Sequence, residues 1–81
     1  MKLLSIGYGN LVSADRIIAV IHPSSAPAKR FIKSAAATGK LIDASSGRKT
    51  ESVIITDSDY VILSPLVAEQ LLLSNEKDDS M

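Results

Sequence analysis

The sequence has 81 residues, no cysteine and one histidine, and its nine basic side chains balance its nine acidic ones. Without cysteine, neither a disulfide nor a thiolate-bound zinc can stabilise so short a chain. Yet 46% of the residues are hydrophobic. Small domains without disulfides or metals often complete their core by self-association. We therefore expect one domain, residues 1–74, that forms a homo-oligomer.

The balanced charge hides a difference between the two parts of the chain. Residues 1–50 contain eight Lys and Arg against two Asp, whereas residues 51–81 contain one Lys against seven acids. Such segregation indicates a surface that faces a polyanion. A fold that interleaves the two parts would cancel this asymmetry, so that alternative stays open.

The first half of the chain predicts two strands and a helix. Residues 2–6 are expected to form a strand that ends at Gly7, and the β-branched run at residues 16–21 a second one before Pro23. A serine cap followed by Pro27 starts a helix that Gly39 ends. On this helix Ala28, Phe31, Ile32 and Ala35 are expected to face the core, with Lys29, Arg30 and Lys33 on the opposite side.

The second half predicts a sheet with two apolar faces. A short strand at residues 40–43 leads into a loop, and residues 53–55 and 61–63 form a hairpin around residues 57–59. Neither hairpin strand alternates, so both sheet faces need cover, and residues 66–73 are apolar enough to supply part of it. We expect an α+β domain of about five strands and two helices, followed by a flexible polar tail at residues 75–81.

The residues of a catalytic or cofactor site are missing. Gly7 and Gly9 resemble the start of a dinucleotide fingerprint, but Val12 replaces its third glycine. Asp57 and Asp59 suit a turn better than a metal site, and His22 has no partner for nucleophilic catalysis. We therefore expect no enzymatic activity, no cofactor, no metal and no small-molecule substrate. The apolar run before Gly7 is too short for a secretory signal, and no stretch reaches the length of a membrane span, so a cytoplasmic protein is expected.

The stretch SSGRKTES, residues 45–52, places two cations in a turn that Gly47 permits. An arginine fork and a lysine point charge both suit phosphate. The expected binding residues, which carry most of the excess positive charge of the first half, are Arg16, Lys29, Arg30, Arg48 and Lys49. Three aromatic residues are too few to stack single strands, so double-stranded DNA is the expected partner. The alternative is an interaction module whose cations meet an acidic protein.

Four stretches resemble one known family. They are GYGNLVSADRI from Gly7, PSSAPAKR from Pro23, TGKLIDASSGRKT from Thr38 and VIITDSDYVILS from Val53, and together they are similar to the RemA-type regulators of bacterial extracellular-matrix (biofilm) genes. The resemblance implies a nucleoid-associated, DNA-binding transcriptional regulator whose small α/β subunits close into rings of seven or eight with DNA wrapped along the ring. It also implies DNA-binding roles for Arg16, Arg48 and Lys49.

Overall fold

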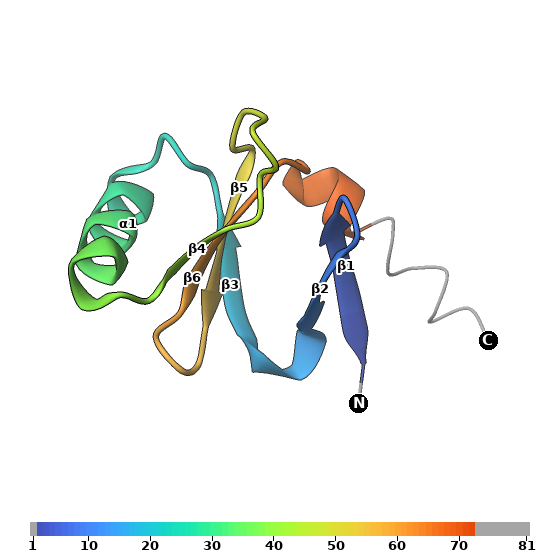
Figure 1. The fold of residues 1–81 in the computed structure, drawn as a ribbon, viewed down its shortest axis with the longest axis horizontal. Coiled ribbons are helices and arrows are strands. Elements are labelled where there is room, and N and C mark those ends of the chain that lie inside the picture. Colours follow the sequence, from blue (N-terminus) through green and yellow to red (C-terminus); the bar gives the residue numbers. More distant parts are fainter. Residues whose placement is uncertain (1, 73–81) are drawn as a thin grey trace.

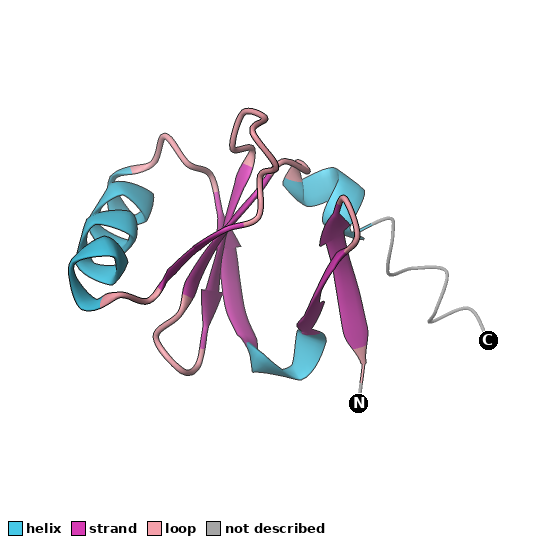
Figure 2. Ribbon diagram, viewed as in Figure 1, coloured by secondary structure: helices cyan, strands magenta, loops and turns pink. Residues whose placement is uncertain are grey.

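The computed structural model describes residues 2–72 and arranges them in three layers (Figure 1). A four-stranded sheet lies in the middle, a helix covers one face, and a two-stranded hairpin with a helical turn at residues 68–72 covers the other (Figure 2). The elements are, in chain order, β1 (Leu3–Gly7), β2 (Asn10–Ser13), the 3-10 turn η1 (Ala14–Arg16), β3 (Ile17–Ile21), α1 (Ala26–Thr38), β4 (Leu41–Asp43), β5 (Ser52–Thr56) and β6 (Val61–Ser64). The α+β class is confirmed.

The central sheet has the strand order β3-β5-β6-β4. β5 pairs antiparallel with β3 and also with β6, its partner in the predicted hairpin. β4, which α1 connects to β3, runs parallel to β6. Every residue of β5 is buried, because its side chains meet the helix layer on one face and the hairpin layer on the other. The prediction that this sheet needs cover on both faces is therefore confirmed.

The helix α1 begins and ends where its capping residues predict. Ser25 Oγ accepts a hydrogen bond from the amide of Ala28 at 3.3 Å, and Gly39 takes the left-handed conformation with φ of 74° at the C-terminus. Ala28 and Ala35 are buried against the sheet, and Ile32 packs beside them. The two alanines bring the helix close to the sheet, so its buried face is narrow.

The helical periodicity predicts Phe31 in the core, and that prediction is wrong. The residue is 45% exposed, because it lies at the rim of the narrow face that the alanines define. Its ring instead borders a surface hollow with Ser34, Thr38, Lys40 and Asp59.

The opposite layer contains a strand that the sequence did not predict. β2 pairs antiparallel with β1, and the connecting turn holds Gly7, Tyr8 and Gly9 at φ values of 104°, 53° and 80°. Leu4 and Ile6 point from β1 into a core with Ile54 and Leu71. Residues 66–72 thus help to cover the sheet as expected, through the buried Leu71.

The start of β3 differs by one residue from the predicted one. The sequence predicts that Arg16 starts a strand, but Arg16 ends η1, and β3 begins at Ile17. The tail predicted at residues 75–81 lies outside the described residues. Within the described part of the chain, no helix combines the length and apolar character needed to cross a membrane.

Candidate nucleic-acid interface

Arg48 and Lys49 lie on an exposed turn that we call the basic loop, residues 44–51. The amide of Arg48 donates to the carbonyl of Ser45 at 3.0 Å, and the two residues between them, Ser46 and Gly47, have φ values of 56° and 76°. Two successive positive φ values are typical of a type I′ turn, which reverses the chain tightly. Both cationic side chains are consequently exposed at the end of the sheet.

The start of the basic loop is anchored to the sheet by polar contacts. The amide and the hydroxyl of Ser45 both donate to Asp43 Oδ1, at 3.0 and 2.5 Å. The hydrogen bond from the hydroxyl, and to a smaller extent that from the amide, stabilises the charged carboxylate. Together they lower the pKa of Asp43 below its ordinary value. The amide of Ala44 also donates to the carbonyl of Leu63 at 2.9 Å. These hydrogen bonds fix the first residues of the basic loop to strands β4 and β6.

The β1–β2 turn lies against the basic loop. The guanidinium carbon of Arg48 is 4.7 Å from the centroid of the Tyr8 ring, within the range of a cation–π contact. The Asn10 amide nitrogen donates to the carbonyl of Gly7 at 3.1 Å and to that of Ala44 at 3.5 Å, so it links the two turns. Sequence reasoning missed this contact, for which the only signal is a tyrosine between two glycines.

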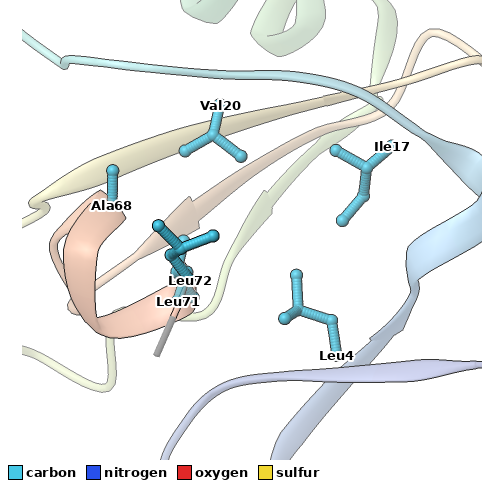
Figure 3. Close-up of a pocket in the computed structure, with 6 residues that line it drawn as sticks. All are labelled: Leu4, Ile17, Val20, Ala68, Leu71 and Leu72. Carbon is cyan, nitrogen blue, oxygen red and sulfur yellow. The ribbon is translucent and has the colours of Figure 1, made fainter. Parts of the chain in front are cut away.

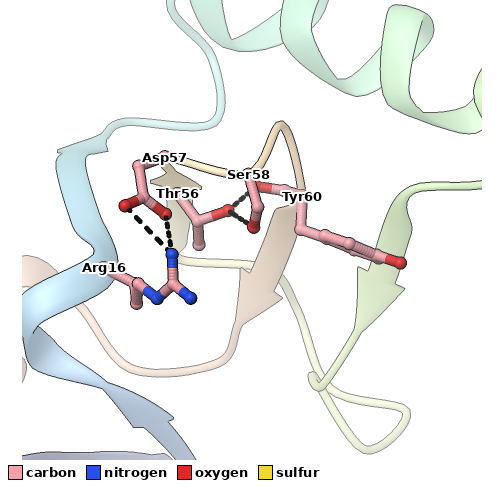
Figure 4. A network of polar contacts seen from close by, with 5 residues as sticks. All are labelled: Arg16, Thr56, Asp57, Ser58 and Tyr60. Carbon is pink, nitrogen blue, oxygen red and sulfur yellow. Dashed lines mark hydrogen bonds and ion pairs between the residues drawn. The ribbon is translucent and has the colours of Figure 1, made fainter.

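Arg16 lies at a second place, beside the β5–β6 turn (Figure 4). Its Nη1 donates to both carboxylate oxygens of Asp57 at 3.3 Å. The two side chains are 64% and 45% exposed, so solvent screens the pair and its contribution to stability is small. Thr56 Oγ1 donates to the carbonyl of Tyr60 at 3.0 Å and fixes the turn that carries Asp57.

Lys29 and Arg30 lie at a third place, on α1, where both are exposed. They follow Ala28, whose side chain packs on the sheet, and the helical step turns them away from that face. Because α1 follows β3, and β3 ends beside Val53, the start of the helix lies at the same end of the sheet as the basic loop (Figure 1).

The five predicted residues thus do not form one patch on a single subunit. Arg16 neighbours the Thr56 end of β5, while Arg48 and Lys49 precede its Ser52 end. Among the described residues, no carboxylate lies within ion-pair distance of Lys29, Arg30, Arg48 or Lys49. Four of the five cations therefore have no acidic partner in the described part of the chain, and Arg16 is paired with Asp57.

A hollow on the other side of the sheet from α1 is of a different kind. A pocket of about 380 Å³ opens between β1, β3 and the helical turn at residues 68–72, and Figure 3 shows the side chains that surround it. They are all aliphatic: Leu4, Ile17, Val20, Ala68, Leu71 and Leu72. Such a lining offers no side-chain donor to phosphate, so the pocket is not part of the cationic site.

Known proteins resemble this chain over most of its length. Proteins of Clostridium kluyveri and Alkaliphilus oremlandii are 53% and 52% identical to it over 83 and 81 residues, which cover 98% and 99% of this chain and 90% and 87% of their own. A protein of Geobacillus thermodenitrificans is 59% identical over 69 residues, 85% of this chain and 79% of its own. All three carry the provisional name of regulatory protein.

A family model also matches residues 3–73, and its description is RemA-like, extracellular matrix regulatory protein A-like. The match includes the basic loop, the β1–β2 turn and Arg16. The chain therefore belongs to the RemA-like family of regulatory proteins.

Proposed function

We propose that this protein is a non-enzymatic, DNA-binding transcriptional regulator, acting on extracellular-matrix genes as the family's description suggests. The observation that carries the proposal is the basic loop: Arg48 and Lys49 are exposed on an anchored turn, and no described carboxylate neutralises them. Arginine and lysine in such a setting bind the phosphate backbone, which supplies most of the affinity in non-specific DNA recognition.

The assembly is proposed to be a ring of seven or eight subunits. Cyclic symmetry would repeat the basic loop around one rim, so that weak contacts from several subunits add up along one duplex. Exposed apolar side chains support self-association, since the described surface carries Leu3, Leu11, Ile18, Ile42 and Leu72, each more than two-fifths exposed. A neutral chain can bind DNA in this way, because phosphate responds to local potential and not to total charge.

Binding to a short DNA duplex of arbitrary sequence, followed by gel shift or anisotropy over a salt series, tests the proposal. Arg48→Ala is expected to weaken binding strongly and to reduce the slope of log affinity against log salt by about 0.9 for every phosphate that the variant no longer neutralises. The native mass should stay unchanged, since the side chain is exposed.

Lys40→Ala is the matched control, because it removes one positive charge at the other end of the sheet, beside Tyr60. It is expected to change the affinity less than Arg48→Ala does. A wild-type protein that binds no duplex at low salt, or an Arg48→Ala variant that binds like wild type, would contradict the proposal. Binding to an acidic protein instead would favour the interaction module.

A further inference from the structure

We infer that Tyr8 is a positioning residue of the DNA-binding site, a role that rests on the proposed function and names a new member of that site. Its ring lies 4.7 Å from the guanidinium carbon of Arg48. The contact joins two turns that are far apart in the sequence, and it involves an arginine of the basic loop that is proposed to bind phosphate.

The conformation of Tyr8 has no explanation in packing. The residue is 55% exposed and has a φ of 53°, a left-handed conformation that bulky side chains rarely adopt. Gly7 and Gly9 on either side also have positive φ values. The two-residue turn between Gly7 and Asn10 requires positive φ values, but glycine or asparagine would meet that requirement at a lower cost than tyrosine. An exposed tyrosine at such a position indicates that its ring has a role of its own.

The surroundings keep the ring and the arginine together. Asn10 donates to the carbonyl of Gly7 on one turn and to that of Ala44 on the other. The Arg48 amide is bonded within its own turn, and Ser45 anchors that turn to Asp43. The backbone is thus held at both turns, and the remaining freedom is that of the two side chains, of which the arginine is the longer.

Stacking on Tyr8 removes much of that freedom before DNA arrives. A guanidinium held against a ring keeps its N–H groups available at the edge for phosphate, and less rotamer entropy is lost on binding. A second ring contact, Lys40 Nζ at 5.7 Å from the Tyr60 centroid, involves a strongly hydrated ammonium group and lies at the opposite end of the sheet. Tyr60 is therefore a suitable control.

The test uses Tyr8→Asn and Tyr8→Phe in the full chain, titrated with the same short duplex over the salt series. Asparagine tolerates a positive φ but has no ring, so the turn is preserved while the stack is removed. We expect Tyr8→Asn to weaken binding by about two- to five-fold for each subunit on the DNA, the range of an exposed cation–π contact. The salt slope should not change, because the variant keeps every cation that neutralises a phosphate. Tyr8→Phe should bind like wild type.

Two comparisons make the result specific. Tyr60→Ala should leave the affinity unchanged, and Tyr8→Asn added to Arg48→Ala should cause no further loss, because the ring then has no arginine to hold. The inference is overturned if wild type binds while Tyr8→Asn binds equally well, if Tyr8→Phe is as weak as Tyr8→Asn, or if the loss persists without Arg48. A wild type that fails to bind overturns the proposed function itself.

Discussion

Among the residues that the structure describes, Arg16 is the predicted binding residue with an acidic partner. Its Nη1 reaches both oxygens of Asp57 at 3.3 Å, and the pair is largely solvent-exposed. An exposed ion pair of this kind contributes about 0–1 kcal/mol. A DNA phosphate, which brings its own negative charge, would have to compete with Asp57 for the guanidinium. We therefore expect Asp57 to lower DNA affinity in the wild-type protein.

Asp57→Asn is expected to increase DNA affinity by up to about five-fold per bound subunit, the equivalent of about 1 kcal/mol. The change frees Arg16 and removes a negative charge beside a residue that is proposed to bind DNA. Asp59→Asn is the matched control, since it makes the same charge change on the same turn, and asparagine suits the φ of 69° at that position. Anisotropy titrations at low salt measure both variants. Equal affinities for the two would show that the ion pair does not restrain Arg16.

At the scale of the element, local chemistry specified the helix and the hairpin strands. Ser25, Pro27 and Gly39 act on backbone groups within a few residues, so the limits of α1 could be predicted from the sequence. The apolar runs of β5 and β6 likewise predicted a hairpin buried on both faces. These elements follow from interactions between residues that are close along the chain.

Elements that depend on tertiary contacts could not be predicted. β2 has only two apolar residues and follows a glycine-rich turn, and its strand conformation comes from pairing with β1. Phe31 was misplaced because the helical periodicity alone does not show how narrow a buried face two alanines create. The contact of Tyr8 with Arg48 has the same origin, since it depends on how two distant turns meet.

The C-terminus of α1 supports a prediction about stability. Gly39→Ala is expected to lower the free energy of unfolding by about 1–2 kcal/mol, because the residue has a φ of 74° and alanine is strained there. A Cβ at Gly39 would meet no atom within 4 Å, so the cost is one of backbone conformation and not of a clash. Urea denaturation measures it. Gly39→Asn should cost less, and an alanine variant as stable as wild type would argue against the strain.

At the scale of the whole molecule, the exposed apolar surface supports the proposed assembly of several subunits. The side chains of both strands at the sheet margins contribute to it: Ile42 lies on β4, and Ile18 lies on β3 with 66% of its surface exposed. Ile18 also lies at the register shift between Ile17 and Ala19, where it has no partner on β5. Bulges are common at sheet edges, and an edge strand with an exposed isoleucine is a ready contact for another chain.

Ile18→Asp is therefore expected to lower the native mass from a multiple of 8.6 kDa toward that of a single chain. A charged side chain in an apolar contact between subunits has no partner, and its burial is costly. Native mass spectrometry or sedimentation measures the change, and an unchanged circular dichroism spectrum would show that the fold survives. Ser34→Asp, an exposed site on α1, is the control. An intact assembly in the Ile18 variant would place the subunit contact elsewhere.

The placement of the basic loop and Arg16 at opposite ends of β5 has a consequence for how much DNA one subunit occupies. Five strand residues span about 13 Å, and a duplex laid along that direction advances about 3.4 Å per base pair. A single phosphate cannot bridge that distance. In the proposed complex, the two sites of one subunit would contact phosphates about four base pairs apart on one strand. Alternatively, they would contact both strands of the duplex across a groove.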